Sequence, residues 1–160
     1  MPFSIYKIVS GGQTGADIGG LTAAGALGLQ TGGFAPKGWL TEDGPQESLL
    51  RSFGLIECEE EGYSARTRRN VTHSDGTVLV GDYQRGGSRL TYETANELNK
   101  PVFTVAHPIT DTERDMLVDE FRGWLELHEI GILNVAGNRE SQSPGIAEFT
   151  RSFLVKALSR

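Results

Sequence analysis

The sequence predicts an α/β domain of the Rossmann-like type, in which a mostly parallel sheet carries helices on both faces. Short, almost continuously apolar runs alternate with longer segments of helical pattern along the chain. Several of these runs end in a polar, glycine-containing loop that leads into the next helix. No repeat, low-complexity tract or linker interrupts the 160 residues. We therefore expect a single three-layer domain over residues 1–160.

The first half of the chain supplies three predicted strands and three predicted helices. The strands are expected at 5–10, 30–36 and 55–60, and the helices at 16–27, 44–54 and 63–74. The first helix is rich in alanine and glycine, which makes it thin enough to pack closely on the sheet. Pro45 and Gly54 mark the two ends of the second helix, and Tyr63 and Ser64 are expected to cap the third.

The second half of the chain continues the alternation. Strands are expected at 77–82, 100–108 and 131–138, and helices at 89–99, at 111–129 and from 143 onward. Ser143 is the expected N-cap of the final helix, with Pro144 as its first residue. Apolar residues between Ile146 and Leu158 recur at helical spacing and indicate one buried face. These patterns leave the order of the strands open.

Composition limits the classes of function. The net charge of −6 argues against a protein that coats nucleic acid. No apolar run approaches the roughly 18 residues of a membrane span, and the N-terminus does not resemble a signal peptide, so we expect a cytoplasmic location. Cys58 is the only cysteine and the three histidines are scattered, so no disulfide, multi-cysteine zinc site or other metal site is predicted.

Three loops predict the functional site. The segments "SGGQTGAD", "GDYQRGGS" and "AGNRESQSPG" each follow a predicted strand and precede a helix. Parallel strands bring such loops to one edge of the sheet, where backbone N–H groups at helix N-termini attract anions. We expect the amides of residues 11–15 and 86–88 to receive the phosphate of a small ligand. The candidate ligand contacts in these segments are Gly11, Gly12, Gln13, Thr14, Gly15, Asp17, Arg85, Gly86, Gly87, Ser88, Thr91, Asn138 and Ser141.

Familiar nucleotide-binding motifs are not matched. No lysine follows the first loop, which excludes a P-loop NTPase. The dinucleotide pattern G-x-G-x-x-G has Ser10 in place of its first glycine, and no acidic residue stands about 20 positions later to hold a ribose, so NAD binding is disfavoured. "GGSRL" lacks the second glycine of G-x-S-x-G, which makes Ser88 a poor nucleophile.

The segment after residue 63 offers further ligand contacts. Arg66, Arg69 or Asn70, and His73 recur at helical spacing, and guanidinium groups bind phosphate or other oxyanions well. A solvated helix face is the alternative interpretation. Ser74 and Asp75, which follow, are also candidate ligand contacts.

Three other residues complete the set of candidates. Lys37 lies in the long irregular stretch "APKGWLTEDGP", which we expect to cover the site or form a surface contact. Trp39 in the same stretch would either stack on a ligand ring or anchor the loop. Glu93 is the carboxylate that we would assign to catalysis, although Glu93 and Asp17 could also simply complement helix dipoles.

Five segments in order resemble the molybdenum carrier family, a circularly permuted YpsA-like branch of the SLOG superfamily. They are "SGGQTGAD", "PKGWLTEDGP", "TRRNVTHSDGTVL", "RGGSRLT" and "NVAGNRESQSPGI", within a resemblance that extends from about Ile5 to Leu158. The resemblance implies a Rossmann-like fold related to the LOG, or lysine decarboxylase-like, proteins and to DprA. It also implies a glycine-lined cleft for a nucleotide-like ligand or for molybdenum cofactor, a pterin with a phosphate, and it suggests a homo-oligomer.

The resemblance leaves two functions open. One is a small-molecule binding protein. The other is a phosphoribohydrolase or similar N-glycosidase, in which Glu93 would assist departure of the base and Asp17 would position the ribose. The LOG signature P-G-G-x-G-T-x-x-E is only partly kept in "RGGSRLTYE", which retains Gly86, Gly87, Thr91 and Glu93 at altered spacing. DNA binding, as in DprA, is opposed by the net charge of −6.

Overall fold

The computed structural model describes residues 4–159 and contains a six-stranded sheet in which every pairing is parallel. The strand order is β5-β2-β1-β8-β6-β7. The strands are β1 (Lys7–Val9), β2 (Gln30–Ala35), β5 (Leu55–Glu57), β6 (Gly76–Val80), β7 (Val102–Val105) and β8 (Ile132–Gly137). The predicted α/β class with a parallel sheet is confirmed.

The position of β8 determines which loops become neighbours. Although β8 is the last strand in the chain, it lies between β1 and β6 in the centre of the sheet. The loops that follow β1, β8 and β6 therefore leave from three adjacent strands at the carboxyl edge. In open α/β sheets this edge, near the point where the strand order reverses, is where ligands bind.

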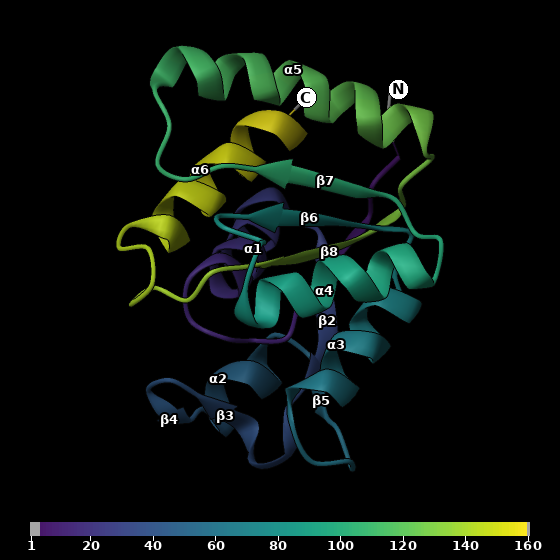
Figure 1. The fold of residues 1–160 in the computed structure, drawn as a ribbon, viewed down its shortest axis with the longest axis vertical. Coiled ribbons are helices and arrows are strands. Elements are labelled where there is room, and N and C mark those ends of the chain that lie inside the picture. Colours follow the sequence, from purple (N-terminus) through teal and green to yellow (C-terminus); the bar gives the residue numbers. More distant parts are fainter. Residues whose placement is uncertain (1–3, 160) are drawn as a thin grey trace.

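Helices cover both faces of the sheet (Figure 1). Helix α6 (Ile146–Leu158) packs against α1 (Ala16–Leu27) and α5 (Asp111–Leu127), while α3 (Tyr63–Thr72) packs against α4 (Gly86–Glu97) in front of the strands. The larger core cluster joins residues of α1, α5 and α6 to the central strands, with Phe121 and Phe153 fully buried. Burial of this apolar surface is the main force that holds the layers together.

Small residues let α1 approach its neighbours, as its composition predicts. A Cβ atom on Gly20 would lie 2.6 Å from Val135 of β8, and one on Gly19 would lie 2.5 Å from the carbonyl oxygen of Ala147 in α6. Neither position has room for a side chain, so these two glycines serve packing.

The irregular stretch after β2 has more structure than the sequence predicts. It forms the short 3-10 helix η1 (Lys37–Trp39) and an antiparallel ribbon of β3 (Leu40–Thr41) and β4 (Gly44–Pro45). The following helix, α2 (Glu47–Ser52), is accordingly shorter than the predicted span 44–54. Trp39 is 5% exposed and belongs to the smaller core cluster, so it anchors this segment.

Two of the predicted N-caps are wrong. Helix α3 has Gly62 as its N-cap instead of Tyr63 and Ser64, and α6 has Gly145 instead of Ser143. Gly145 has φ of 90°, a backbone conformation that favours glycine, and its amide donates to the carboxylate of Glu140. A carboxylate from outside the helix thus takes the place of the predicted serine cap.

Helix α4 begins earlier than predicted, at Gly86 instead of residue 89. Arg85 is its N-cap, in an extended conformation. The residues Gly86, Gly87 and Ser88 therefore belong to the start of the helix and not to a loop before it. Gly86 has a φ of 65°, and the amides of Gly87 and Ser88, in the first turn, point along the helix axis.

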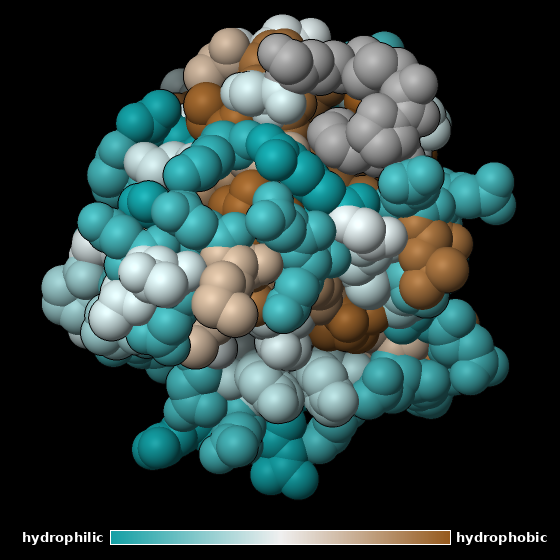
Figure 2. All heavy atoms as spheres, turned by 90° about the horizontal axis from the view of Figure 1, so that it is seen from above, coloured by the Kyte–Doolittle hydropathy of each residue, from teal (hydrophilic) through white to brown (hydrophobic). Residues whose placement is uncertain are grey.

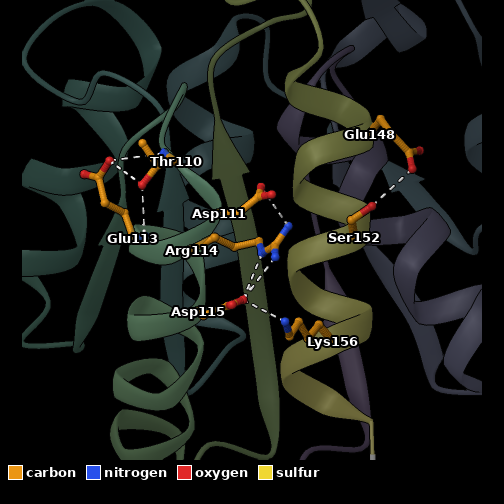
Figure 3. Close-up of polar contacts among 8 residues, drawn as sticks. All are labelled: Thr110, Asp111, Glu113, Arg114, Asp115, Glu148, Ser152 and Lys156. Atoms are coloured by element: carbon orange, nitrogen blue, oxygen red, sulfur yellow. Dashed lines mark hydrogen bonds and ion pairs between the residues drawn. The ribbon is translucent and has the colours of Figure 1, made fainter.

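The side of the molecule that carries α5 is charged. Thr110 and Glu113 form a capping box at its start, and Asp115 accepts a 2.7 Å hydrogen bond from Lys156 of α6 (Figure 3). Figure 2 looks onto this side and shows mostly hydrophilic residues with hydrophobic ones scattered among them. Within residues 4–159, no helix combines the length and the apolar character needed to cross a membrane.

Candidate functional site

A cleft of about 190 Å³ lies where the loops after β1, β6 and β8 meet. Helix α3 closes one side of this cleft. Its lining comprises Gln13 and Asp17 from the first loop and helix, Arg85, Gly86, Gly87, Ser88 and Thr91 from the second, Ala136, Gly137, Asn138, Arg139 and Gln142 from the third, and Tyr63, Arg66 and Thr67 from α3. Segments more than 120 positions apart in the chain, such as those with Gln13 and Gln142, thus share one small cavity.

A buried ion pair forms the floor on the side of β1. Asp17 is 3% exposed, and its Oδ2 accepts hydrogen bonds from the amide of Gln13 at 3.1 Å and from Nη1 of Arg66 at 3.2 Å. Burial raises the pKa of Asp17, while the Arg66 guanidinium and the Gln13 amide oppose that rise. The buried Nε of Arg66 has no hydrogen-bond partner among the described residues.

The glycines of the first loop make room for other parts of the protein. A Cβ atom on Gly11 would lie 1.5 Å from Nη1 of Arg66, and one on Gly15 would lie 2.3 Å from the carbonyl oxygen of Asn138. At Gly12 it would lie 2.7 Å from the side chain of Leu50. The close approach that these glycines permit is therefore with the chain's own groups.

The backbone amides of this loop are also occupied. Gly12 donates to Oγ of Ser10 at 3.0 Å, Gln13 to Asp17, and Thr14 to Oε1 of Gln13 at 3.1 Å. The expectation that the amides of residues 11–15 receive a phosphate is therefore wrong for these three residues. Their N–H groups stabilise the loop itself.

Glu42 joins the first loop to the third. Its carboxylate accepts hydrogen bonds from the hydroxyls of Thr14 and Ser141 and from the amide of Ser141 at 3.2 Å, and its own amide donates to Oε1 of Gln13 at 2.8 Å. The hydroxyls of Ser141 and Thr14 lower the pKa of Glu42. The predicted ligand contacts Thr14 and Ser141 thus donate to Glu42, a residue that the sequence did not single out as a partner for them.

The three helices that start at this edge differ in one respect. Asp17 lies in the first turn of α1, and the carboxylate of Glu140 accepts from the amides of Gly145 and Ala147 at the start of α6, at 2.6 and 3.0 Å. The chain's own carboxylates thus compensate both positive helix ends. Helix α4 has no acidic residue in its first turn, and no side chain within residues 4–159 caps it.

Asn138 ties the second loop to the third. Its Oδ1 accepts from the amide of Asp82 at 2.8 Å, and its Nδ2 donates to the carbonyl oxygen of Asp82 at 2.9 Å and to Oγ of Ser88 at 3.4 Å. The Thr91 hydroxyl donates to the carbonyl oxygen of Gly87 at 3.0 Å. Asn138 and Thr91 both line the cleft. Their hydrogen bonds also hold the start of α4 in place.

Residues 8–158 match the model of the circularly permutated YpsA SLOG family. The chain belongs to this family. A crystal structure described as "Putative molybdenum carrier protein" from Syntrophus aciditrophicus SB is 33% identical, with a TM-score of 0.87 over 98% of this chain and 96% of that chain. No curated protein matches.

Three further predicted contacts of this SLOG family chain hold the fold together. The side-chain amide of Asn70 accepts from the amide of Phe34 at 2.8 Å and donates to its carbonyl oxygen at 3.0 Å, which fastens α3 to β2. Ser74 and Asp75 precede β6 and so lie at the amino edge of the sheet, opposite the cleft. Asp75 there accepts from the amide of Ile132 at 2.7 Å. The prediction that Ser74 and Asp75 contact a ligand in the cleft is corrected accordingly.

Lys37, Arg69 and Glu93 do not line the cleft either. Each is exposed and has an acidic or basic partner of its own: Lys37 lies 3.9 Å from Glu61, Arg69 lies 2.7 Å from Glu60, and Glu93 lies 2.6 Å from Arg89. Glu93 points to a separate shallow groove on the outer side of α4. The prediction that Glu93 assists departure of the base from a ligand in the cleft is therefore corrected.

Proposed function

We propose that this protein binds a small phosphorylated molecule in the cleft between its three loops, with the phosphate at the start of α4. The observation that carries the proposal is the contrast between the helix starts. Asp17 lies in the first turn of α1 and Glu140 accepts from amides at the start of α6, whereas no side chain of residues 4–159 accepts from the first amides of α4, which line the cleft. The carboxylate of Asp82, which precedes α4, is engaged with the Gln84 amide and with Arg85. A helix N-terminus with free amides is a favourable site for phosphate.

The charges that line the cleft support an anionic ligand. Arg66, Arg85 and Arg139 line the cleft and are cationic. Arg66 is paired with the lining anion Asp17 at 3.2 Å and Arg85 with Asp82 at 3.1 Å, so Arg139 adds to the positive charge of the lining residues. Guanidinium groups and backbone amides together form charge-assisted hydrogen bonds with phosphate or other oxyanions.

The size of the cleft suggests how much of the ligand is enclosed. Pockets that surround a drug-sized molecule have volumes of about 300–1,000 Å³, and this cleft has about 190 Å³. We propose that the phosphate end enters and that the remainder lies at the rim. Such partial enclosure suits a protein that must release its cargo intact.

Molybdenum cofactor and nucleotides are both candidate ligands. The related crystal structure carries the words "molybdenum carrier" in its description. Within residues 4–159, no group of three or more His, Cys, Asp or Glu side chains is arranged to hold a metal ion. If the ligand is molybdenum cofactor, we propose that the start of α4 holds it by its phosphate. The N-glycosidase alternative has no support from Glu93, which pairs with Arg89 outside the cleft.

A matched pair of variants at Gly87 tests the proposal. Gly87→Pro removes one amide donor in the first helical turn, where proline is tolerated. Gly87→Ala keeps this donor, and its Cβ atom would meet no atom within 4 Å. Calorimetric titration with inorganic phosphate and AMP at low salt should give binding that Gly87→Pro weakens about tenfold or more. Gly87→Ala should bind like the wild type. Absence of binding by the wild type, or equal binding by both variants, would contradict the proposal.

A further inference from the structure

We infer that the ligand carries a planar heterocyclic ring close to its phosphate, and that Tyr63 is the residue against which this ring stacks. This inference rests on the proposed function and adds to it a class of ligand and a residue that selects that class. It depends on the position of Tyr63, on the cation beneath its ring and on the occupation of the other candidate aromatic side chains.

Tyr63 stands at the side of the cleft. It is the first residue of α3, and it lines the same cavity of about 190 Å³ as Gly86, Gly87 and Ser88. A single small molecule can therefore touch both Tyr63 and the start of α4. Tyr63 is 39% exposed, although it is a large aromatic residue.

The guanidinium of Arg66 lies over one face of the Tyr63 ring. The Cζ atom of Arg66 lies 5.3 Å from the centre of the Tyr63 ring, within the range of a cation–π contact. Arg66 is itself fixed by Asp17 at 3.2 Å. The contact with Arg66 restrains the Tyr63 ring before a ligand arrives, which would reduce the entropy lost on binding. A flat ring can cover the part of Tyr63 that remains exposed.

The other exposed or nearby aromatic residues are less suited to this role. Trp39 is buried in the smaller core cluster, with Arg51 over its ring at 4.9 Å. Tyr83 and Tyr92 stack on each other at 4.9 Å and line the separate groove outside the cleft. Among the cleft residues, Tyr63 supplies the aromatic ring.

The chemistry that follows is a phosphate joined to a planar nitrogen heterocycle. Stacking on an aromatic side chain tolerates any flat ring, so a purine nucleotide and a pterin phosphate share it. Ribose 5-phosphate has the same phosphate but no ring. Comparison of these three probes separates the contribution of the ring from that of the phosphate.

We would titrate the full chain with ribose 5-phosphate, AMP and neopterin monophosphate in calorimetry, for the wild type, Tyr63→Ala and Tyr63→Phe. Tyr6→Ala serves as the control, because Tyr6 is 51% exposed and precedes β1 at the opposite edge of the sheet. The wild type should bind AMP or neopterin monophosphate at least about fivefold more tightly than ribose 5-phosphate, the lower end of base–aromatic stacking. Tyr63→Ala should remove this preference, while Tyr63→Phe and Tyr6→Ala should keep it.

The outcomes separate the two proposals. If the wild type binds all three phosphates equally, or if Tyr63→Ala keeps the preference for a ring, the role of Tyr63 is overturned and the phosphate site stands. If none of the probes binds, the proposed function fails and the inference fails with it. Unchanged affinity of Tyr63→Ala for ribose 5-phosphate would show that Arg66 and the phosphate site are intact. The probe, AMP or neopterin monophosphate, whose affinity exceeds that of ribose 5-phosphate by the larger factor identifies the ligand class.

Discussion

The guanidinium of Arg66 occupies the space that a side chain at Gly11 would need. A Cβ atom on Gly11 would lie 1.5 Å from Nη1 and 2.6 Å from Cζ of Arg66. Arg66 reaches this position from α3, 55 residues further along the chain. The contact joins the first loop to the helix that closes the cleft and brings Arg66 to Asp17.

Gly11→Ala should destabilise the protein and weaken phosphate binding, because Arg66 has to leave its place. Overpacking of this kind costs about 1–3 kcal/mol. Gly25→Ala is the control: Gly25 lies on the exposed side of α1, a Cβ atom there would meet no atom within 4 Å, and alanine should stabilise the helix by up to about 1 kcal/mol. Urea unfolding of both variants checks the prediction. Equal stability of Gly11→Ala and the wild type would show that Arg66 does not occupy this space.

Arg66→Met should destabilise the protein in a manner that depends on pH. It leaves the buried carboxylate of Asp17 without its cation, which costs about 3–5 kcal/mol when the carboxylate is ionised. Burial already raises the pKa of Asp17 above 3.8, and loss of Arg66 raises that pKa further. The pKa of Asp17 is therefore higher in the folded protein than in the unfolded chain. The protonated carboxyl group favours folding below the unfolded pKa, and this contribution is lost as pH rises through the pKa of Asp17 in the folded protein.

Denaturant unfolding at pH 4 and pH 8 checks this prediction. The loss of stability in Arg66→Met should be larger at pH 8. Arg68→Met is the control, because Arg68 lies on the same helix with an exposed partner, Glu97, at 3.4 Å, and such pairs contribute about 0–1 kcal/mol. A loss that is the same at both pH values would contradict the buried pair.

Glu42→Gln should loosen the connection between the first and third loops at neutral pH. Hydroxyl groups of Ser141 and Thr14 lower the pKa of Glu42 below 4.5. The stability that its carboxylate contributes is therefore present above about 4.5 and is lost as pH falls through the lower pKa of the folded protein. The difference in melting temperature between the wild type and Glu42→Gln should be clear at pH 7 and shrink toward pH 3. A difference that grows toward acid pH would refute the assigned sign.

Glu93→Gln should bind phosphate and AMP as tightly as the wild type. Glu93 pairs with Arg89 at 2.6 Å on the outer side of α4 and does not line the cleft. Calorimetry under the conditions used for Gly87→Pro gives the comparison. Affinity for AMP reduced tenfold or more in Glu93→Gln would return this residue to the binding site.

Local sequence patterns predicted the elements of the fold and the loops that gather at one edge. The strand and helix alternation depends on neighbouring residues, and parallel strands necessarily place their following loops together. The pattern did not reveal that β8 lies between β1 and β6. This order depends on contacts between strands far apart in the chain.

The partners of the site residues could not be predicted for the same reason. Glu42 accepts from Ser141, which is 99 positions away, and Arg66 pairs with Asp17, which is 49 positions away. Such contacts decide which donors remain free. The distant residue Glu42 also accepts from the Thr14 hydroxyl. The amides of Gly12, Gln13 and Thr14 and those at the start of α6 are instead occupied by side chains no more than seven positions away, whose geometry the sequence pattern does not reveal. The start of α4 is therefore the anion site that we propose.

A crystal structure of the protein with AMP tests the central claim most directly. The account predicts the phosphate within hydrogen-bond distance of the amides of Gly87 and Ser88, with a guanidinium of the cleft as a second contact. A phosphate at the first loop, at the start of α6 or on the outer side of α3 would contradict it.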